Sequence, residues 1–498
     1  MENGHKAAVA VAREGALSLA MVAALALGGC ATDPDIPRPQ VSPSAAYRHG
    51  GNAPAAAPKT DLGWWHQFQD VRLVHLVERT ARANHDIRIA VERARQARAG
   101  TVAADSRLLP SVNLAAARAD SSTGLPPQVK QSMPDIKASR TGFDVAWEID
   151  LFGGASAAAD AAAREAEAAA HGIAGAQLIA SAEVARQYFL WQGARQRLEI
   201  LESLLRTQRD TERMTRSRHR EGMASEFDVA RAAGEALNLE AALPALRTLM
   251  AVTEGRMAVL TGSDPSLPVP ELHATDGFRW ALPEDPLSGQ PADLLQRRPD
   301  LLAAEQRLAA ESSRLAEAKS NLFPKIFLSI LFGRQSLMLN DTLDLPASRY
   351  SNAALAFGLP LFNAGRVRAG VEAQSAKERE ALLFYEKAIL GAVEDVENSL
   401  VVMAGERRRV DALAATARQR DKAVGHATSL FREGQIDLLQ LLDVQRARLA
   451  TELALAEAKA DRAIGYVHLY KALGGGWEAL PAPASAQVAT SSPSGAEQ

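Results

Sequence analysis

Three carboxylates occupy alternate positions in a stretch whose other residues are mostly apolar. Asp144, Glu148 and Asp150 stand at even positions, and the odd positions hold Phe143, Val145, Trp147, Ile149 and Leu151. Successive side chains of an extended strand point to opposite faces, so we expect the three acids on one face. Carboxylates gathered in this way attract cations, as they do in ion-conducting pores. Simple solvation of a water-exposed face explains the same acids equally well.

Motifs typical of catalysis are absent from the sequence. The ten histidines include no His-Glu-x-x-His pair, and there is neither a Walker loop nor a Gly-x-Ser-x-Gly elbow. The run Arg407-Arg408-Arg409 indicates a solvated helix face. With 56 basic and 59 acidic residues the net charge is −3, which provides no basic field for nucleic acid. We therefore expect no enzyme, no bound metal and no nucleic-acid partner.

The single cysteine, Cys30, is a candidate site of lipid attachment. It follows the short apolar run Ala16–Leu27 and two glycines. The run is too short to cross a membrane and is typical of a signal-peptide core. Its end resembles the bacterial lipobox, in which the cysteine receives a diacylglycerol and becomes the new, N-acylated terminus. We predict a signal peptide at 1–29 and no cofactor beyond these acyl chains. A chance cysteine beside an ordinary cleavage site is the alternative.

Segments rich in proline and alanine flank the rest of the chain. Residues 30–61 cannot bury enough apolar surface to fold alone, so we interpret them as a lipidated, extended tether. Residues 478–498 have a similar composition and are predicted to be a disordered tail. Ala31 follows Cys30, where an aspartate would favour retention in the inner membrane of the lipoproteins that this end resembles. We therefore expect the mature lipoprotein to be located in the outer membrane.

The two halves of the remaining chain repeat each other. Asp86 and Asp300 lie 214 positions apart, as do Pro110 and Pro324, while the Glu-Gly pairs ending at Gly222 and Gly434 are 212 apart. Each half is predicted to contain a helix, two strands joined by a loop, a long helix, a tip and a second helix. This pattern gives a first repeat at 62–260, a linker at 261–296 and a second repeat at 297–477.

Proline spacing indicates unusually long helices, and hence a mainly α-helical fold. No proline occurs between Pro134 and Pro244, or between Pro360 and Pro481, and a proline inside a helix breaks its hydrogen-bond ladder. A helix from Gly365 to Leu430 would extend about 100 Å at 1.5 Å per residue. Its apolar residues recur at the spacing of a coiled coil: Ile389, Val393, Val396, Leu400 and Met403. The helices alone would also suit a soluble coiled-coil protein.

Four strands are predicted, at about 109–119, 140–152, 324–335 and 350–362, with polar loops at 120–138 and 336–349. Strands of about ten residues suit a tilted crossing of a bilayer. An open sheet edge has no partners in lipid, and four strands are too few to close a membrane barrel. Several copies would then have to contribute to one barrel. A small soluble sheet capping a helical bundle is the alternative.

Together these residues resemble the TolC-like outer-membrane factors, in the lipoprotein branch that serves resistance-nodulation-division pumps. The resemblance covers about Leu62 to Trp477. It rests on motifs that occur in order: Trp64-Trp65, Asn84-His85-Asp86, Arg297-Arg298-Pro299-Asp300-Leu301, Phe323-Pro324, Val393-Glu394-Asp395 and Leu473-Gly474-Gly475-Gly476-Trp477. It implies a homotrimer with a twelve-stranded barrel in outer-membrane lipid and a long periplasmic α-helical barrel, with the 261–296 linker in an equatorial region. Its implied partners are a periplasmic adaptor and an inner-membrane transporter.

The resemblance also implies where the adaptor and the gate would lie. Gly222 and Gly434 stand at the helix tips that would contact the adaptor, and glycine tolerates the positive φ of a tight reversal. The gate positions hold Phe431, Leu439, Asp443 and Arg446. Phe431 stands where a tyrosine is common, Leu439 would form an apolar constriction, and Asp443 a ring of charge. Pairing of Asp443 with Arg446 on one helix surface is the alternative.

The function that we expect is that of an outer-membrane channel subunit of a tripartite efflux system. A duct for type I protein secretion shares the implied fold, and a non-conducting, periplasm-spanning coiled-coil lipoprotein is a further alternative. The lipobox, the Arg-Arg-Pro-Asp motif and the Leu-Gly-Gly-Gly-Trp motif favour efflux. The cargo leaves no signature in the sequence, because selection in such systems is largely made by the pump.

Overall fold

The structure is a computed structural model that describes residues 35–41, 44–50, 63–126, 128–129, 134–273, 281–283 and 291–481. The predicted signal peptide, Cys30, most of the tether and most of the tail therefore lie outside the described residues. The chain divides into two compact units. The first contains residues 1–39, 95–168 and 304–385, and the second contains residues 40–94, 169–303 and 386–498.

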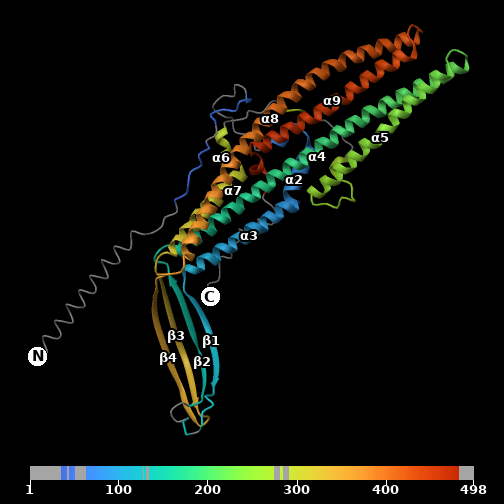
Figure 1. The fold of residues 1–498 in the computed structure, drawn as a ribbon. Coiled ribbons are helices and arrows are strands. Elements are labelled where there is room, and N and C mark those ends of the chain that lie inside the picture. The colour runs from blue at the N-terminus through green and yellow to red at the C-terminus, as the bar shows by residue number, and fades with distance from the viewer. Residues whose placement is uncertain are drawn as a thin grey trace. The chain divides into compact units, whose positions relative to one another are not determined.

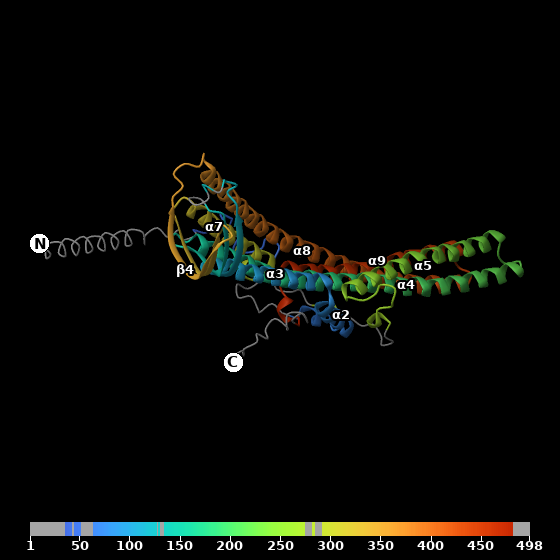
Figure 2. The same cartoon turned by 90° about the horizontal axis from the view of Figure 1, so that it is seen from below.

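The duplication is visible in the lengths of the four long helices. Helices α4 (Gly154–Arg220) and α8 (Arg366–Arg432) both have 67 residues, and their first residues are 212 positions apart. Helices α5 (Glu226–Leu260) and α9 (Leu438–Ala472) both have 35 residues and begin 212 positions apart. Two views show α4 running beside α5 and α8 beside α9 (Figure 1 and Figure 2). The predicted mainly helical, duplicated fold is confirmed.

Helix α5 continues through Pro244, although proline spacing alone suggests a break there. Proline removes one hydrogen bond from the ladder. Residues of α5 near Pro244 pack against α4 in an apolar cluster. The cluster contains Leu201 and Leu205 of α4 with Ala236, Leu239, Leu243 and Leu246 of α5. Packing of this apolar face outweighs the lost bond. None of the helices in the described ranges has a stretch both long and apolar enough to cross a membrane.

The first unit contains a four-stranded antiparallel sheet, ordered β1-β2-β3-β4 (Figure 1). The strands are β1 (Ser111–Ser121), β2 (Ile136–Ile149), β3 (Lys325–Leu339) and β4 (Leu343–Gly358). Strands β3 and β4 extend through most of the predicted loop at 336–349 and reverse at 340–342. Asn340 and Asp341 have φ values of 51° and 56° there, a conformation that these residue types tolerate well.

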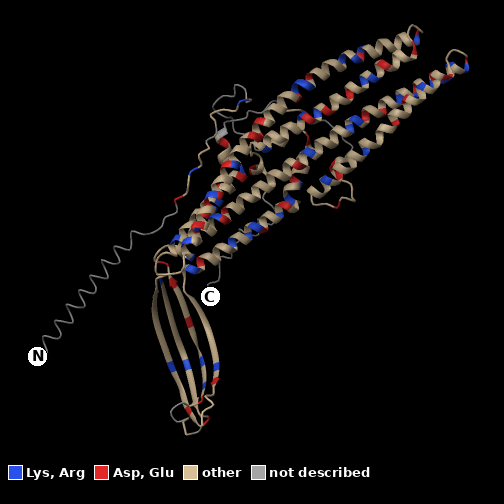
Figure 3. Ribbon diagram, in the orientation of Figure 1, with Lys and Arg blue, Asp and Glu red and all other residues tan. Residues whose placement is uncertain are grey.

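Helices α3 (His85–Asp105) and α7 (Pro299–Ser320) precede the two strand pairs, and η2 (Ser106–Leu108) follows α3. The indole Nε1 of Trp147 donates to the carbonyl oxygen of Leu108 at 3.1 Å. Phe152 stacks on Phe323 with 5.0 Å between ring centroids. These contacts join β2 to the ends of both helices within the first unit. Charged residues are frequent along the helices and sparse along the strands (Figure 3).

The second unit has an aromatic core around η1 (Trp64–Phe68). Its shorter elements are α2 (Val71–Ala83), η3 (Pro270–Leu272), η4 (Pro291–Asp293), α6 (Leu294–Arg297) and η5 (Trp477–Ala479). Trp64 stacks on Tyr470 at 5.6 Å, and Phe68 packs on Phe189 at 4.7 Å. The hydroxyl of buried Tyr188 donates to Asp70, which caps α2. These contacts attach the first predicted motif, Trp64-Trp65, to helices α4 and α9.

Inside the second unit, both repeats have a side-chain hydrogen bond to the carbonyl oxygen at the end of their last helix. The side chain of Asn84, just before α3, donates to the carbonyl oxygen of Leu260 at 2.9 Å. The guanidinium of Arg298, just before α7, donates to the carbonyl oxygen of Ala472 at 3.1 Å and pairs with Asp300 and Asp395. Leu260 and Ala472 are the last residues of α5 and α9. In each repeat, a side chain just before the helix that leads into the strands therefore binds the end of the last helix.

Residues 44–50 and Gln40 lie along helix α8, and we call them the strap. The backbone N–H of Gln40 donates to Glu386 at 2.7 Å, and the imidazole Nδ1 of His49 lies 2.8 Å from Glu397. Burial raises the pKa of Glu397, but hydrogen bonds from His49 and from the backbone of Arg48 outweigh burial and hold that pKa below its ordinary value. Tyr47 is buried between these contacts. Part of the predicted tether is thus fixed to the helices.

Candidate functional site

The strand register gathers most of the large apolar residues on one face of the sheet. In the pairing of β2 with β3, Phe143 faces Phe332, Val145 faces Ile330 and Trp147 faces Leu328. Directly paired residues point to the same side, and Phe143 stacks on Phe332 with 5.3 Å between centroids. The register continues the apolar set into β1 at Val112 and Leu114, and into β4 at Leu355 and Phe357.

The opposite face holds charges of both signs, together with the apolar side chains of Phe327 and Leu331 of β3. Glu148 forms an ion pair with Lys325 of β3 at 2.9 Å, and Arg140 lies on the same face of β2, four residues before Asp144. Within the described part of the chain, Asp144 has no ion-pair partner. The sequence of β2 alone suggests an acidic face. In the sheet, basic residues such as Lys325 of the neighbouring strand offset part of that negative charge.

Asp150 lies beyond the strand, because β2 ends at Ile149 rather than at residue 152. Its carboxylate accepts hydrogen bonds from the backbone N–H and the hydroxyl of Ser156, both at 2.7 Å. These donors belong to the first turn of α4, whose N–H groups have no partner inside the helix. Asp150 thus stabilises the junction between strand and helix.

The two predicted tips have the same backbone. Gly222 and Gly434 have φ values of 78° and 74°, the left-handed region in which glycine is strongly favoured. The next helix begins with a capping box in each case, made by Ser225 with Asp228 and by Asp437 with Gln440. A left-handed glycine followed by a capping box determines a tight reversal between α4 and α5 and between α8 and α9.

Phe431 is buried at the second tip, with 6% of its surface exposed. It belongs to a cluster that contains residues of three helices: Ala232, Ala427, Leu438, Leu441 and Leu442. The guanidinium of Arg218, from α4, lies 5.3 Å from its ring centroid, a favourable cation–π distance. The phenyl ring therefore joins the second tip to the first without the hydroxyl that a tyrosine would supply.

The other three predicted gate residues lie on the exposed side of α9. Leu439 is 45% exposed, and Asp443 is exposed without a hydrogen-bond or ion-pair partner in the described ranges. Arg446 pairs with Glu235 of α5, with Nε 2.9 Å from a carboxylate oxygen. The alternative prediction from the sequence was an ion pair between Asp443 and Arg446, and the structure does not have this pair in the described ranges. Arg446 ties α9 to α5 instead.

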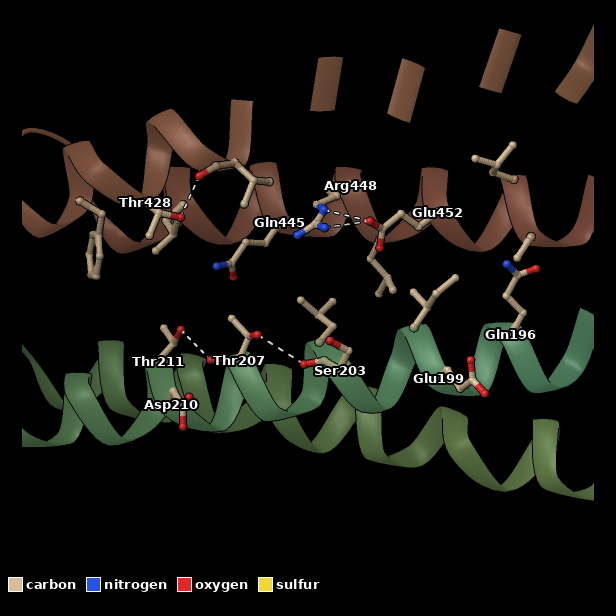
Figure 4. Close-up of a pocket in the computed structure, with 18 of the residues that line it drawn as sticks. Gln196, Glu199, Ser203, Thr207, Asp210, Thr211, Thr428, Gln445, Arg448 and Glu452 are labelled. Atoms are coloured by element: carbon tan, nitrogen blue, oxygen red, sulfur yellow. Dashed lines mark hydrogen bonds and ion pairs between the residues drawn. The ribbon is translucent and has the colours of Figure 1, made fainter. Parts of the chain in front are cut away.

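Sequence reasoning missed a polar cavity between α4 and α9, with a volume of 660 Å³ (Figure 4). Hydroxyls of Thr207 and Thr211 bond back to the carbonyl oxygens four residues earlier on α4, and Gln445 and Arg448 face them from α9. The side-chain oxygen of buried Gln445 has no hydrogen-bond partner among the residues that the structure describes. Hydroxyl residues at every fourth position of α4, from Ser203 to Thr215, are the signal that could have revealed this polar helix face.

The geometry of the sheet suits a channel. One face of the sheet is largely apolar and the other carries both carboxylates of β2, as is expected of strands set between lipid and water. Among the residues that the structure describes, no three His, Cys, Asp or Glu side chains lie close enough to hold a metal ion. The remaining candidate residues are the two helix reversals, the buried Phe431 and three exposed side chains of α9.

Comparison with known proteins agrees with this geometry. A family model described as outer membrane efflux protein matches residues 76–263 and 291–475. The pyoverdine export outer membrane protein OpmQ of Pseudomonas putida is 31% identical over 465 residues, which are 91% of this chain and 96% of OpmQ. The toluene efflux pump outer membrane protein TtgI, also of Pseudomonas putida, is 29% identical over 92% of this chain and 98% of its own.

A solved structure of the outer-membrane channel OprN covers 90% of this chain and 100% of its own, with 30% identity and a TM-score of 0.81. The two segments that the family model matches correspond to the two repeats, and the relatives align along nearly their whole lengths. The chain therefore belongs to the outer membrane efflux protein family.

Proposed function

We propose that three copies of this chain form one outer-membrane pore that is anchored by lipid on Cys30 and catalyses no reaction. As a member of its family, the chain is an outer-membrane channel subunit of an efflux system that works with adaptor and transporter partners. The proposal adds the number of copies, the anchor and the class of transporter, which we take to be resistance-nodulation-division.

The observation that supports a shared pore is the pair of open sheet edges. Strands β1 and β4 lie at the two ends of the sheet, and most of the large apolar residues of the four strands share one face. An open edge is excluded from lipid, because its N–H and C=O groups would have no partners there. Strands β1 and β4 run antiparallel to each other, so β4 of one copy could pair with β1 of the next and continue the antiparallel order.

The helix tips support contact with an adaptor. Gly222 and Gly434 form two tight reversals with the same backbone at the ends of α4–α5 and α8–α9. In the assembly, the gate would consist of Leu439 and Asp443 on the exposed side of α9, held by Phe431 and by the pairing of Arg446 with Glu235. The Leu439 side chains would narrow the opening, and the Asp443 carboxylates would add charge to it.

Lipid attachment is supported by the sequence around Cys30 and by the strap. Cys30 is followed by a proline-rich segment, and the chain then docks on α8 through Gln40 and His49. A docked strap would hold the acylated end of the mature chain beside the helices. Incorporation of labelled palmitate by the natural chain, and its loss in Cys30→Ser, would test this part of the proposal.

The relatives favour efflux of small molecules over protein secretion. OpmQ is named for pyoverdine export and TtgI for toluene efflux. Two such different cargoes on similar chains support selection by the pump rather than by the duct. A non-conducting coiled-coil lipoprotein does not account for the largely apolar sheet face or for the similarity to the OprN channel over 90% of this chain.

Conductance measurements test the proposal. The purified mature, full-length protein should migrate as a trimer that resists SDS until it is heated, and it should conduct ions when inserted into a planar lipid bilayer. Asp443→Ala should increase the open conductance, because it removes charge from the proposed gate. A monomeric protein that never conducts would overturn the proposal.

A further inference from the structure

Helices α5 and α9 are matched in register as well as in length. Both have 35 residues, both begin with a capping box, and their N-caps, Ser225 and Asp437, are 212 positions apart. The tips before them have glycines with nearly equal φ values. A residue on α5 and the residue 212 positions later on α9 therefore occupy the same height above their tips.

An ion pair shows that the two helices lie side by side at this height. Arg446 of α9 pairs with Glu235 of α5. The counterpart of Arg446 in the first repeat is Gly234, the residue next to Glu235. The ion pair thus joins positions of α5 and α9 that differ by only one residue in the repeat numbering. Residues of the two helices that are one turn nearer the tips therefore also lie at equal heights.

The first repeat has its own residues at the two exposed gate positions. Phe227 is the counterpart of Leu439, and the exposed fractions of the two side chains are 70% and 45%. Arg231 is the counterpart of Asp443, and its guanidinium lies 6.0 Å from the ring centroid of Phe227. An exposed apolar residue is thus followed four positions later by a charged residue on both helices, but the charges have opposite sign.

We propose that Phe227 and Arg231 complete the gate, in a tier of Phe227 with Leu439 and a tier of Arg231 with Asp443. This inference rests on the proposed trimeric pore. The duplication makes the trimer nearly six-fold, so a ring at this height would alternate three carboxylates with three guanidinium groups. Opposite charges that alternate around a narrow ring attract their neighbours, whereas three carboxylates alone would repel. The ring is therefore stable when closed.

Charge reversal tests the pairing. Arg231→Glu and Asp443→Arg would each place six like charges in the ring, so each should increase the mean conductance of the full-length protein in planar bilayers severalfold. The double variant Arg231→Glu/Asp443→Arg restores alternation and should return conductance to the natural level, as expected for a directly coupled pair. Arg206→Glu, an equal change of charge on an exposed position of α4, should leave conductance unchanged.

The outcomes separate this inference from the proposed function. If Asp443→Arg opens the channel while Arg231→Glu does not, or if the double variant stays open, the first repeat is not part of the gate and this inference is wrong. If neither the natural protein nor any variant conducts, the pore itself is refuted. Because a reversed charge can impair assembly, Arg231→Gln and Asp443→Asn provide a milder pair, and each should raise conductance less than its reversal. Unchanged conductance in Arg231→Gln with an assembled trimer would also overturn the inference.

Discussion

The two helical hairpins, α4–α5 and α8–α9, have equal helix lengths and equal tip backbones, but their side chains make different contacts. Phe431 of the second hairpin is buried against residues of the first and lies beneath Arg218. Its counterpart, His219, stays within its own tip, where Nδ1 lies 2.9 Å from the carbonyl oxygen of Ala224 and Nε2 lies 3.2 Å from Glu226.

This difference distinguishes the local interactions that form each hairpin from the contacts that connect the two hairpins. A left-handed glycine and a capping box occur in both halves, and both act through local backbone geometry. Contacts between the hairpins depend on residues that the halves do not share, such as Phe431 and Arg446. Duplication has preserved the scaffold, and substitution on that scaffold has made one hairpin the site of the proposed gate.

The largest effect is expected where the repeats are most alike. Gly262 and Gly474 have φ values of 69° and 72°. A Cβ would lie 2.6 Å from the carbonyl oxygen of Ala83 at Gly262, and 2.9 Å from Cα of Arg298 at Gly474. Gly262→Ala and Gly474→Ala should each lower the free energy of unfolding by about 3 kcal/mol, since left-handed strain and crowding both contribute. Thermal unfolding followed by circular dichroism measures this loss.

The matched control is Gly234→Ala, in the middle of α5, where a Cβ would meet no atom within 4 Å. Alanine costs less conformational entropy than glycine in a helix, so this variant should be more stable by about 0.5–1 kcal/mol. A loss in only one of the two left-handed glycine variants would mean that the repeats do not close in the same way.

An intermediate effect is expected where the hairpins differ. Phe431→Ala removes a buried ring from the cluster between the hairpins and should cost about 3 kcal/mol. His219→Ala, at the same position of the first repeat, removes a half-exposed side chain and should cost less than about 1 kcal/mol. The comparison uses thermal unfolding of the two variants side by side. Equal losses would contradict the asymmetry of the tips.

The smallest effect is expected at the strap. Glu397→Ala removes the acceptor for His49 and for the backbone N–H groups of Arg48 and His49. Trypsin should then cleave after Arg48 faster than in the natural protein, with little change in thermal stability. Glu394→Ala, on an exposed position of the same helix, should leave the cleavage rate unchanged, and protection that survives Glu397→Ala would exclude this docking.

Acid should act on the strap in the same direction as Glu397→Ala. The docked pKa of Glu397 is lower than its ordinary value, so the carboxylate contributes to docking above that ordinary value. This contribution is lost as the pH falls through the docked pKa. Cleavage by an acid-tolerant protease should therefore increase in that acidic range in the natural protein but not in Glu397→Ala.

Local sequence patterns predicted much of the architecture. Proline-free stretches and the repeat spacing placed α8 within two residues of both its ends, because helix formation and its interruption by proline are local effects. Alternation located the strands, but it failed at 336–349, where Ser336 and Asn340 suggested a loop. Pairing with β2 along its whole length holds β3 as a strand there, and the partner strand is not visible in a local pattern.

The candidate site was less predictable for the same reason. Gly222 and Gly434 were found because a tight reversal has a local signal. The partner of Arg446 was not, because Glu235 lies 211 positions away in the sequence, and Lys325 is likewise in the other repeat from Glu148. The strap was interpreted as a free tether, since its composition gives no indication of the acidic residues on α8 that bind it.

Cross-linking between copies tests the shared pore most directly. Ala115 of β1 and the even-numbered residues of β4 from Asn352 to Ala356 point to the same side of the sheet. Cysteine at Ala115, combined in turn with cysteine at each residue from 352 to 356 in the lipidated protein, should give a covalent trimer on oxidation. Linkage should occur only at even-numbered positions, because a disulfide needs Cβ atoms about 4 Å apart. Monomers at every position, in protein that is inserted in membranes, would contradict the account.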